Sequence, residues 1–342
     1  MSRLVFLSLV FVGCSDYEIK SQNGVSGKYN PPEVGVQRQV DSITQVTVPA
    51  VDVLWVLDNS CSMEEEQRAI QDNFPQFMRY FTDSGLDYHV GLVSTDMDNR
   101  NQSGQLVTDR QTGERFIDST MDADTAVASF RERAQLGTGG SADERGKDAA
   151  FAALVTYADS TNRGFYRDDA ILNIVVVSDE RDYSRMSVTE FVSWMLGMKA
   201  EPDTVSFSSV VGPRTGCATA EAGVGYREVT EQVGGIEWSI CTQDWSGLLT
   251  ELGLQAAGLK REFFLTQIPV EESIKVEVED DRGSDEYDVG DDWTYDAKRN
   301  SITFVEFVPD PLTVVRISYI PLAEAESEVE EDEDEDEESE ED

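Results

Sequence analysis

The chain has little histidine and few basic residues, and both shortages restrict its function. His89 is the only histidine among 342 residues, and 27 Lys and Arg stand against 68 Asp and Glu, which gives a formal net charge of −41. Nucleic-acid binding depends on basic side chains that contact phosphates, and so large an acidic excess repels phosphates and attracts cations. We therefore expect no nucleic-acid partner.

The common hydrolase motifs are also absent. The sequence contains no Gly-x-Ser-x-Gly, no HExxH and no phosphate-binding P-loop, and His89 lies in a strand-like segment. A hydrolase would need a serine nucleophile or a metal-activated water that works without histidine. We expect the protein not to be an enzyme, with a hydrolase as the minor alternative.

Long apolar runs are missing as well. The longest near the start, Leu4 to Gly13, is too short to span a bilayer, and with Arg3 before it and Cys14 after it, residues 1–13 predict a signal peptide. The segment Phe11-Val-Gly-Cys14 resembles a bacterial lipoprotein signal. This resemblance implies export, lipidation of Cys14 and anchoring in the cell envelope, and Ser15 favours the outer membrane. The alternative is a simple secretory signal with an incidental cysteine.

Only four cysteines are present. Cys217 and Cys241 follow two strand-like segments, 205–211 and 235–240, that we expect to lie near each other at one edge of a sheet. We predict a disulfide between them, which requires an oxidising compartment and would contribute about 3 kcal/mol by closing a loop of about 25 residues. Cys61 remains, and we expect it to be a small loop residue that faces away from any site.

The most informative segment is an apolar strand that ends in oxygen-bearing side chains. Residues 51–57 predict a strand covered on both faces, and Asp58, Ser60 and Ser62 follow it at alternate positions before a helical pattern begins. Ligands of open α/β sheets bind beyond the carboxyl ends of such strands. Carboxylate and hydroxyl oxygens favour Mg²⁺, Mn²⁺ or Ca²⁺ over zinc.

This Asp-x-Ser-x-Ser segment resembles the metal-ion-dependent adhesion site of von Willebrand factor A domains. A second apolar strand, 170–177, ends at Asp179, where the family has its second metal-site carboxylate. Between the two strands lies a Gly-rich loop, 136–141, where the family places a threonine ligand. Thr138 is the first choice for that ligand and Ser141 the alternative, because the loop departs from the family's usual Gly-Gly-Thr. The resemblance covers residues 46–258.

The resemblance implies a doubly wound α/β fold, with a mostly parallel sheet and helices on both faces. It also implies a metal ion held by Asp58, Ser60, Ser62, Thr138 and Asp179, whose open sixth position takes an Asp or Glu of a protein partner. Asp182 and Asp96 are candidates for a second shell around the ligands. The alternative for both is an ordinary solvated loop carboxylate.

The remaining segments predict smaller parts. Residues 14–45 indicate a lipidated amino terminus and a flexible tether, and Val40 to Val48 could add an edge strand to the α/β domain. Residues 262–321 alternate short β-branched segments with turns, which predicts a small all-β domain. Residues 322–342 form an acidic tail, with 15 acidic and no basic residues from Glu324 onward.

Together these features predict a surface-tethered lipoprotein that binds a protein partner through a divalent cation. The alternative is a structural envelope protein in which the metal only stabilises the domain. The two differ in one observable, because only the first has a ligand-binding face that depends on the metal.

Overall fold

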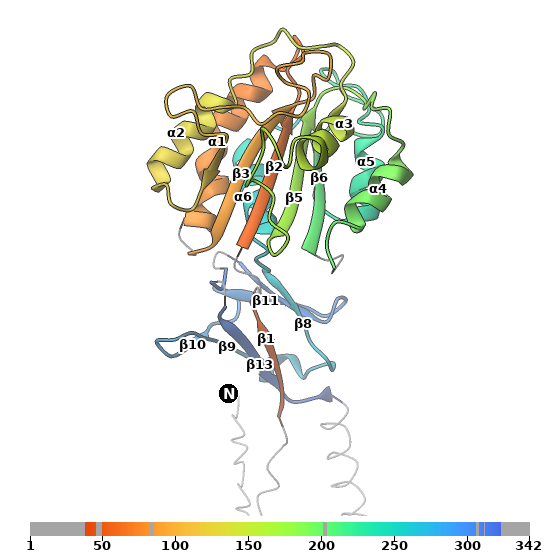
Figure 1. The fold of residues 1–342 in the computed structure, drawn as a ribbon. Coiled ribbons are helices and arrows are strands. Elements are labelled where there is room, and N and C mark those ends of the chain that lie inside the picture. Colours follow the sequence, from red (N-terminus) through yellow and green to blue (C-terminus); the bar gives the residue numbers. More distant parts are fainter. Residues whose placement is uncertain are drawn as a thin grey trace, which may run out of the picture.

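The computed structural model describes residues 38–45, 50–82, 85–200, 204–305, 308–310 and 312–322. The predicted signal peptide, Cys14, most of the tether and the acidic tail beyond Leu322 lie outside these ranges. The described chain forms an α/β unit and, below it in Figure 1, a β unit. None of the described helices is both long enough and apolar enough to cross a membrane.

A six-stranded sheet forms the centre of the α/β unit. Every neighbouring pair of its strands is parallel except β3–β4, which is antiparallel. The strand order is β4 (Phe116–Asp118), β3 (Asp87–Ser94), β2 (Ala50–Leu57), β5 (Ile171–Ser178), β6 (Val205–Val211) and β7 (Glu237–Ser239). The carboxyl ends of β2 and β5 therefore lie side by side at one edge.

Helices cover both faces of this sheet. One hydrophobic core lies under α1 (Glu64–Thr82), α2 (Ala123–Arg133) and α6 (Trp245–Ala256). A second core lies under α3 (Gly146–Phe151), α4 (Val188–Leu196) and α5 (Tyr226–Val233), and α3 continues as a π-helical turn over Ala152–Thr156. The predicted doubly wound α/β fold is confirmed.

The central strand β2 is apolar because it contributes to both cores. Successive side chains of a strand point to opposite faces. Val53 and Trp55 accordingly join the core under α1, and Leu54 and Val56 join the core under α3. With both faces covered, only the ends of β2 are open to polar chemistry.

The β unit consists of two antiparallel sheets packed on a core of its own. One has the order β1 (Gln39–Thr44), β13 (Val314–Tyr319), β9 (Lys275–Glu279) and β10 (Ser284–Tyr287), and the other has β11 (Trp293–Asp296), β12 (Ser301–Phe304) and β8 (Glu262–Phe264). A short 3₁₀ turn, Glu271–Ser273, precedes β9. Val276, Ile302 and Ile317 are fully buried between the sheets. The predicted all-β domain after the α/β unit is present.

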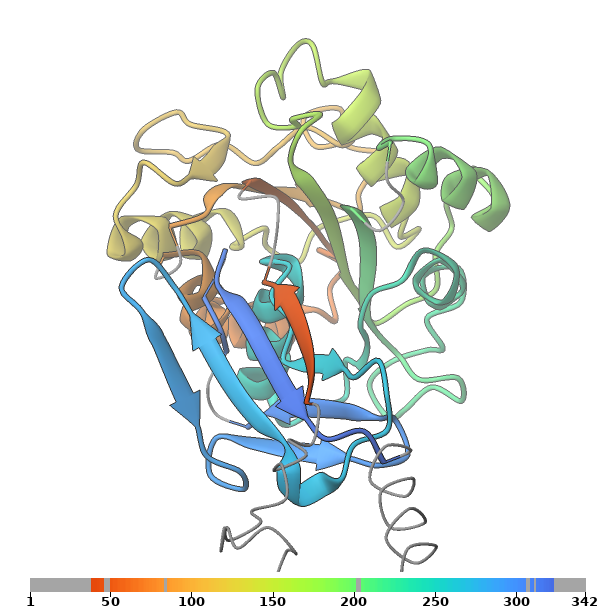
Figure 2. The same cartoon turned by 90° about the horizontal axis from the view of Figure 1, so that it is seen from below.

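The position of β1 corrects one expectation. Residues 39–44 do not extend the α/β sheet but pair with β13, from Gln39 opposite Tyr319 to Thr44 opposite Val314. In Figure 2, orange β1 lies among the blue strands. The reason is a polar contact, since the buried side chain of Asp41 accepts hydrogen bonds from Thr266 and from the Tyr319 hydroxyl. The α/β unit is therefore inserted between β1 and β8.

The acidic stretch between β9 and β12 is more regular than its composition suggests. Its many aspartates are typical of turns, but it contains β10 and β11. Trp293, which is buried in the β-unit core, donates its indole N–H to the Tyr287 carbonyl and anchors these strands.

Candidate metal centre

Asp58 lies at the carboxyl end of β2 and its carboxylate is held on both sides. Its backbone N–H donates to the Val177 carbonyl on β5 at 3.0 Å. One carboxylate oxygen accepts the Ser60 N–H at 2.7 Å and the other accepts the Ser178 hydroxyl at 2.6 Å. Asp58 is 0% exposed. The end of the central strand thus presents a fixed, buried carboxylate.

The structure brings three further predicted ligands to the same place. The hydroxyl oxygens of Ser60 and Ser62 are 3.2 Å apart, and the Ser62 hydroxyl bonds to the carboxylate of Asp179 at the end of β5. The Oδ1 atom of Asp179 is buried and has no hydrogen-bond partner in the described chain. Ser62 itself is exposed, so the group opens to solvent on that side.

Within the described ranges, no positive side chain balances these two carboxylates. Burial raises the pKa of Asp58 and also that of Asp179, against the hydrogen bonds that each accepts. Three other buried carboxylates have cationic partners, which are Arg167 for Asp52, Arg133 for Asp109 and Lys147 for Asp182, whereas Asp41, Asp96 and Glu144 have none among the described residues. Among the described residues, neither Asp58 nor Asp179 forms such an ion pair. A divalent cation is the counter-charge that this set of oxygen donors fits.

The Gly-rich loop lies against the metal loop through its backbone. The Gly140 N–H donates to the Asn59 carbonyl at 2.9 Å, and a Cβ on Gly140 would lie 2.4 Å from the Asn59 Oδ1 atom. Thr138 is exposed, and its hydroxyl has no hydrogen-bond partner in the described part of the chain. Ser141 instead donates to Asp98 at 2.9 Å. The structure therefore brings the loop to the site without joining either candidate hydroxyl to the ligand cluster.

Gln67 on α1 connects the same two loops. Its side-chain amide donates to the Asp58 carbonyl at 3.1 Å and to the Gly137 carbonyl at 3.0 Å. Because Gln67 is itself buried, this double contact fixes the Gly-rich loop relative to β2.

Glu144 is a buried carboxyl beside Asp58 that the sequence analysis did not single out. It is 0% exposed, accepts the Thr95 hydroxyl, and has one oxygen, Oε1, without a partner among the described residues. Burial, and then the neighbouring charge of Asp58, raise the pKa of Glu144 to about 9. Glu144 is thus protonated at neutral pH. Its position directly after the Gly-rich loop was the available signal, but an acidic residue before a helix is ordinarily a solvated one.

Across the described residues, no three His, Cys, Asp or Glu side chains converge into a group that could hold a metal ion. Glu144 therefore does not complete a carboxylate cage with Asp58 and Asp179. The candidate site is a pair of carboxylates supplemented by serine hydroxyls.

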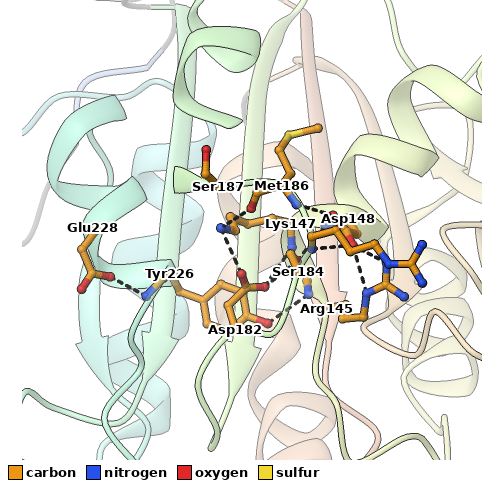
Figure 3. A network of polar contacts seen from close by, with 12 residues as sticks. Arg145, Lys147, Asp148, Asp182, Ser184, Met186, Ser187, Tyr226 and Glu228 are labelled. Atoms are coloured by element: carbon orange, nitrogen blue, oxygen red, sulfur yellow. Dashed lines mark hydrogen bonds and ion pairs between the residues drawn. The ribbon is translucent and has the colours of Figure 1, made fainter. Parts of the chain in front are cut away.

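Asp182, three residues after Asp179, belongs to the polar network drawn in Figure 3. Its carboxylate is 3.1 Å from the Lys147 Nζ atom, and both side chains are almost fully buried. Lys147 also donates to the Met186 carbonyl at 2.8 Å, and Ser184 donates to Asp182 at 2.6 Å. Burial raises the pKa of Asp182, and the charge of Lys147 opposes this rise. Asp182 holds the segment after Asp179 onto α3.

Two further contacts in Figure 3 fix the start of α3. Arg145 forms an ion pair with Asp148, which also accepts the backbone N–H groups of Arg185 and Met186. The Tyr226 hydroxyl accepts the Gly146 N–H at 3.0 Å. These contacts position Glu144 and Asp179 relative to each other.

Asp96, the other second-shell candidate, stabilises its own loop. Its Oδ1 atom accepts the N–H groups of Asp98 and Asn99 at 2.9 and 3.0 Å. Asp96 is nevertheless buried, so it is not the solvated carboxylate offered as the alternative.

The predicted disulfide is confirmed. Cys217 and Cys241 are bonded, with their Cα atoms 6.7 Å apart. The bond joins the segments after β6 and β7. Cys61 is a free, exposed thiol.

Comparisons with known proteins return likenesses of structure only. No family model and no curated protein matches the sequence. A von Willebrand factor type A protein from Catenulispora acidiphila matches with a TM-score of 0.42 and 12% identity, over 84% of this chain and 62% of that one. The chain is similar to von Willebrand factor A domains.

Two other matches are a matrix protein and an adhesin. Proximal thread matrix protein 1 from the mussel byssus has a TM-score of 0.43 and 10% identity, over 66% of this chain and 52% of that one. The pilus adhesin SpaC from Lactobacillus rhamnosus GG has a TM-score of 0.43 and 9% identity, over 82% and 40%. The chain spans less than two thirds of each of these proteins, and likenesses at this level carry no function across.

Proposed function

We propose that this protein is a surface-tethered binding protein of the adhesion type, which takes a carboxylate of a protein partner through a divalent cation. One observation supports the proposal above the others. Two buried carboxylates, Asp58 and Asp179, lie at one sheet edge beside two serine hydroxyls, with no basic side chain paired to them in the described structure.

The proposed roles follow from the contacts. Ser60 and Ser62 offer neutral oxygens, and Asp58 and Asp179 offer negative ones, so these four residues would hold Mg²⁺, Mn²⁺ or Ca²⁺. A bound cation supplies a Lewis-acidic point for a partner's Asp or Glu. Ser178 and the Ser60 N–H keep the Asp58 carboxylate oriented. Glu144, buried beside Asp58, is not assigned as a ligand.

Location and partner belong to the same proposal. Lipidation of Cys14 would place the chain on the cell envelope, most simply the outer membrane, and the disulfide fits an oxidising compartment. The partner is a protein with an exposed acidic side chain. Catalysis is not part of this proposal.

Calorimetric titration of Mg²⁺, Mn²⁺, Ca²⁺ and Zn²⁺ into the full chain tests the site. The acidic tail also attracts cations. The cation affinity of wild type is therefore compared with that of variants that carry the same tail. We expect wild type to bind the cation saturably, Asp58→Ala to lose this binding, and Ser62→Ala to bind at least tenfold more weakly. Ser62 is a suitable position because it is exposed and can be changed without disturbing the core. Asp159→Ala, at an exposed loop position away from the site, removes one carboxylate as the matched control and should leave this binding unchanged.

Two results would contradict the proposal. Identical titrations for wild type and Ser62→Ala would show that the serine motif holds no cation. Saturable binding that raises the melting temperature, but never creates affinity for acidic peptides, would favour the structural envelope protein.

A further inference from the structure

A polar cavity of about 580 Å³ adjoins the metal loop. It lies between the segment after β3 and the end of α2, and Ser94, Gln102 and Leu136 are among its lining residues. The Ser94 hydroxyl donates to the Asn59 side chain at 2.7 Å, and the Asn59 amide reaches Gln102 at 3.5 Å. Because Asn59 stands between Asp58 and Ser60 in the chain, its contacts with two lining residues connect the cavity wall to the metal loop.

Arginines dominate the charge of this cavity. Its charged lining residues are Arg110, Arg115, Arg133 and Glu132. Arg133 is committed to the protein, since it pairs with Asp109 and donates to the Val107 and Glu114 carbonyls. Glu132 accepts the backbone N–H of Arg110. Two arginines therefore remain for an incoming group.

Arg110 and Arg115 make no ion pair with any described residue. About half of the described lysines and arginines form no ion pair, so Arg110 and Arg115 are distinguished by their place at the cavity and not by being unpaired. Arg115 makes one side-chain hydrogen bond, to the Leu106 carbonyl. The guanidinium groups thus keep free donors beside a cavity of the size that accepts ligand groups.

We infer that this cavity is a second anion-binding subsite, and that the partner presents an acidic segment with at least two carboxylates. The inference rests on the proposed function: one carboxylate would go to the cation held by Asp58 and Asp179, and another would enter the cavity and bind Arg110 and Arg115. Guanidinium groups bind carboxylates through charge-assisted, often bidentate hydrogen bonds.

A segment fits better than one small anion because none of the candidate cation ligands is among the lining residues of the cavity, so the two positions are separate. A single carboxylate cannot occupy both, whereas residues along an extended chain are spaced by about 3.3 Å each. Acidic side chains a few residues apart on one segment can therefore reach both positions.

Fluorescence anisotropy with two labelled peptides tests the inference on the full chain in saturating Mg²⁺. The polyacidic probe is a peptide of residues 324–342, and the second probe keeps one Glu while its other acidic residues are replaced by Gln or Asn. We expect wild type to prefer the polyacidic probe. Arg110→Gln/Arg115→Gln should bind that probe about tenfold more weakly and the single-acid probe unchanged. Arg163→Gln/Lys298→Gln removes the same charge at exposed sites elsewhere and should behave as wild type.

The outcomes separate this inference from the proposed function. If the cavity variant keeps the wild-type preference while Ser62→Ala loses both probes, the cavity inference fails and the proposed function stands. If Ser62→Ala also binds normally, both fail. If the cavity variant and the control lose the same affinity for the polyacidic probe, the preference comes from overall charge and the cavity inference is wrong.

The chain's own tail is the competing occupant. The fluorescence anisotropy experiment is therefore repeated with a chain that ends at Leu322 and retains every described strand and helix. If removal of the tail strengthens binding of the polyacidic probe, and the gain depends on Arg110 and Arg115, the tail itself occupies the cavity and the partner assignment is wrong.

Discussion

At the scale of single residues, the buried carboxylates fall into those with a protein counter-charge and those without. Asp109 is of the first kind. Its carboxylate accepts the Ser129 hydroxyl at 2.7 Å and the N–H groups of Gln111 and Thr112, and Arg133 lies 3.7 Å away. Asp58 accepts comparable hydrogen bonds but has no such cation among the described residues, which is why it remains available to a metal.

Replacement of Asp109 by Asn should destabilise the protein at neutral pH and lose its effect in acid. The Ser129 hydrogen bond, followed by those from the backbone, holds the pKa of Asp109 well below its ordinary value of 3.8. A lowered folded-state pKa gives stability that is present above the unfolded-state pKa and is lost as the pH falls through the folded-state pKa. We expect Asp109→Asn to cost about 1–3 kcal/mol at pH 7.

Thermal melts from pH 7 to pH 2.5 check this prediction. The difference between Asp109→Asn and wild type should shrink below about pH 4. Asp159→Asn, at an exposed loop position, is the control and should show no such dependence. A difference that stays constant over this range would contradict the assignment.

At the scale of elements, the loop after β5 and the start of α3 are held together by a buried ion pair. This pair, Lys147 and Asp182, is almost completely buried, with side chains 4% and 1% exposed. A buried charge that loses its partner is costly, whereas removal of both partners costs less. The pair therefore fixes the relative position of the two elements that carry Asp179 and Glu144.

Lys147→Met should destabilise the chain by about 3–5 kcal/mol, because Asp182 would be left buried without a counter-charge. Lys147→Met/Asp182→Leu should recover a substantial part of that loss. Denaturant unfolding of the two variants beside wild type measures both numbers. A double variant as unstable as the single one would show that packing, and not charge, explains the effect.

The sequence was most predictive where the position of a residue depends on a single strand or helix. The apolar runs of β2 and β5, ending at Asp58 and Asp179, indicated both the sheet and the edge that carries the site. Glu144 was missed because its burial depends on Thr95 and Asp58, which come from other strands. Strand β1 was assigned to the wrong sheet because its pairing with β13 spans almost the whole chain, and no local pattern records such a contact.

At the scale of the molecule, the chain passes between the two units at a junction built around Gln45. This side chain is 0% exposed, and its amide donates to the Lys260 carbonyl at 2.8 Å and the Pro309 carbonyl at 3.2 Å. Its oxygen accepts the Lys260 N–H at 3.1 Å. One residue therefore ties the segment that enters the α/β unit to the segment that leaves it.

Gln45→Met should loosen this junction. The apolar replacement leaves the Lys260 N–H and two carbonyls without their partner, at a cost of about 1–3 kcal/mol for each group that stays buried. Differential scanning calorimetry should show the β unit melting at a lower temperature and separating from the α/β transition. Gln232→Met, on the exposed side of α5, is the control. A single transition at the wild-type temperature would show that Gln45 does not couple the units.

The direct route of the chain from β1 to the metal loop has a mechanical consequence. Strands β1 and β2, of six and eight residues, follow each other in the sequence; β1 lies in the β unit and β2 ends at the opposite edge of the α/β unit (Figure 1). When the chain is held on its amino-terminal side and pulled at the metal edge, tension follows covalent bonds through strands that are already extended. The other strands of the β unit are not on this covalent path. Under the proposed function, a pull from a bound partner would load β1 and β2 without first separating those strands.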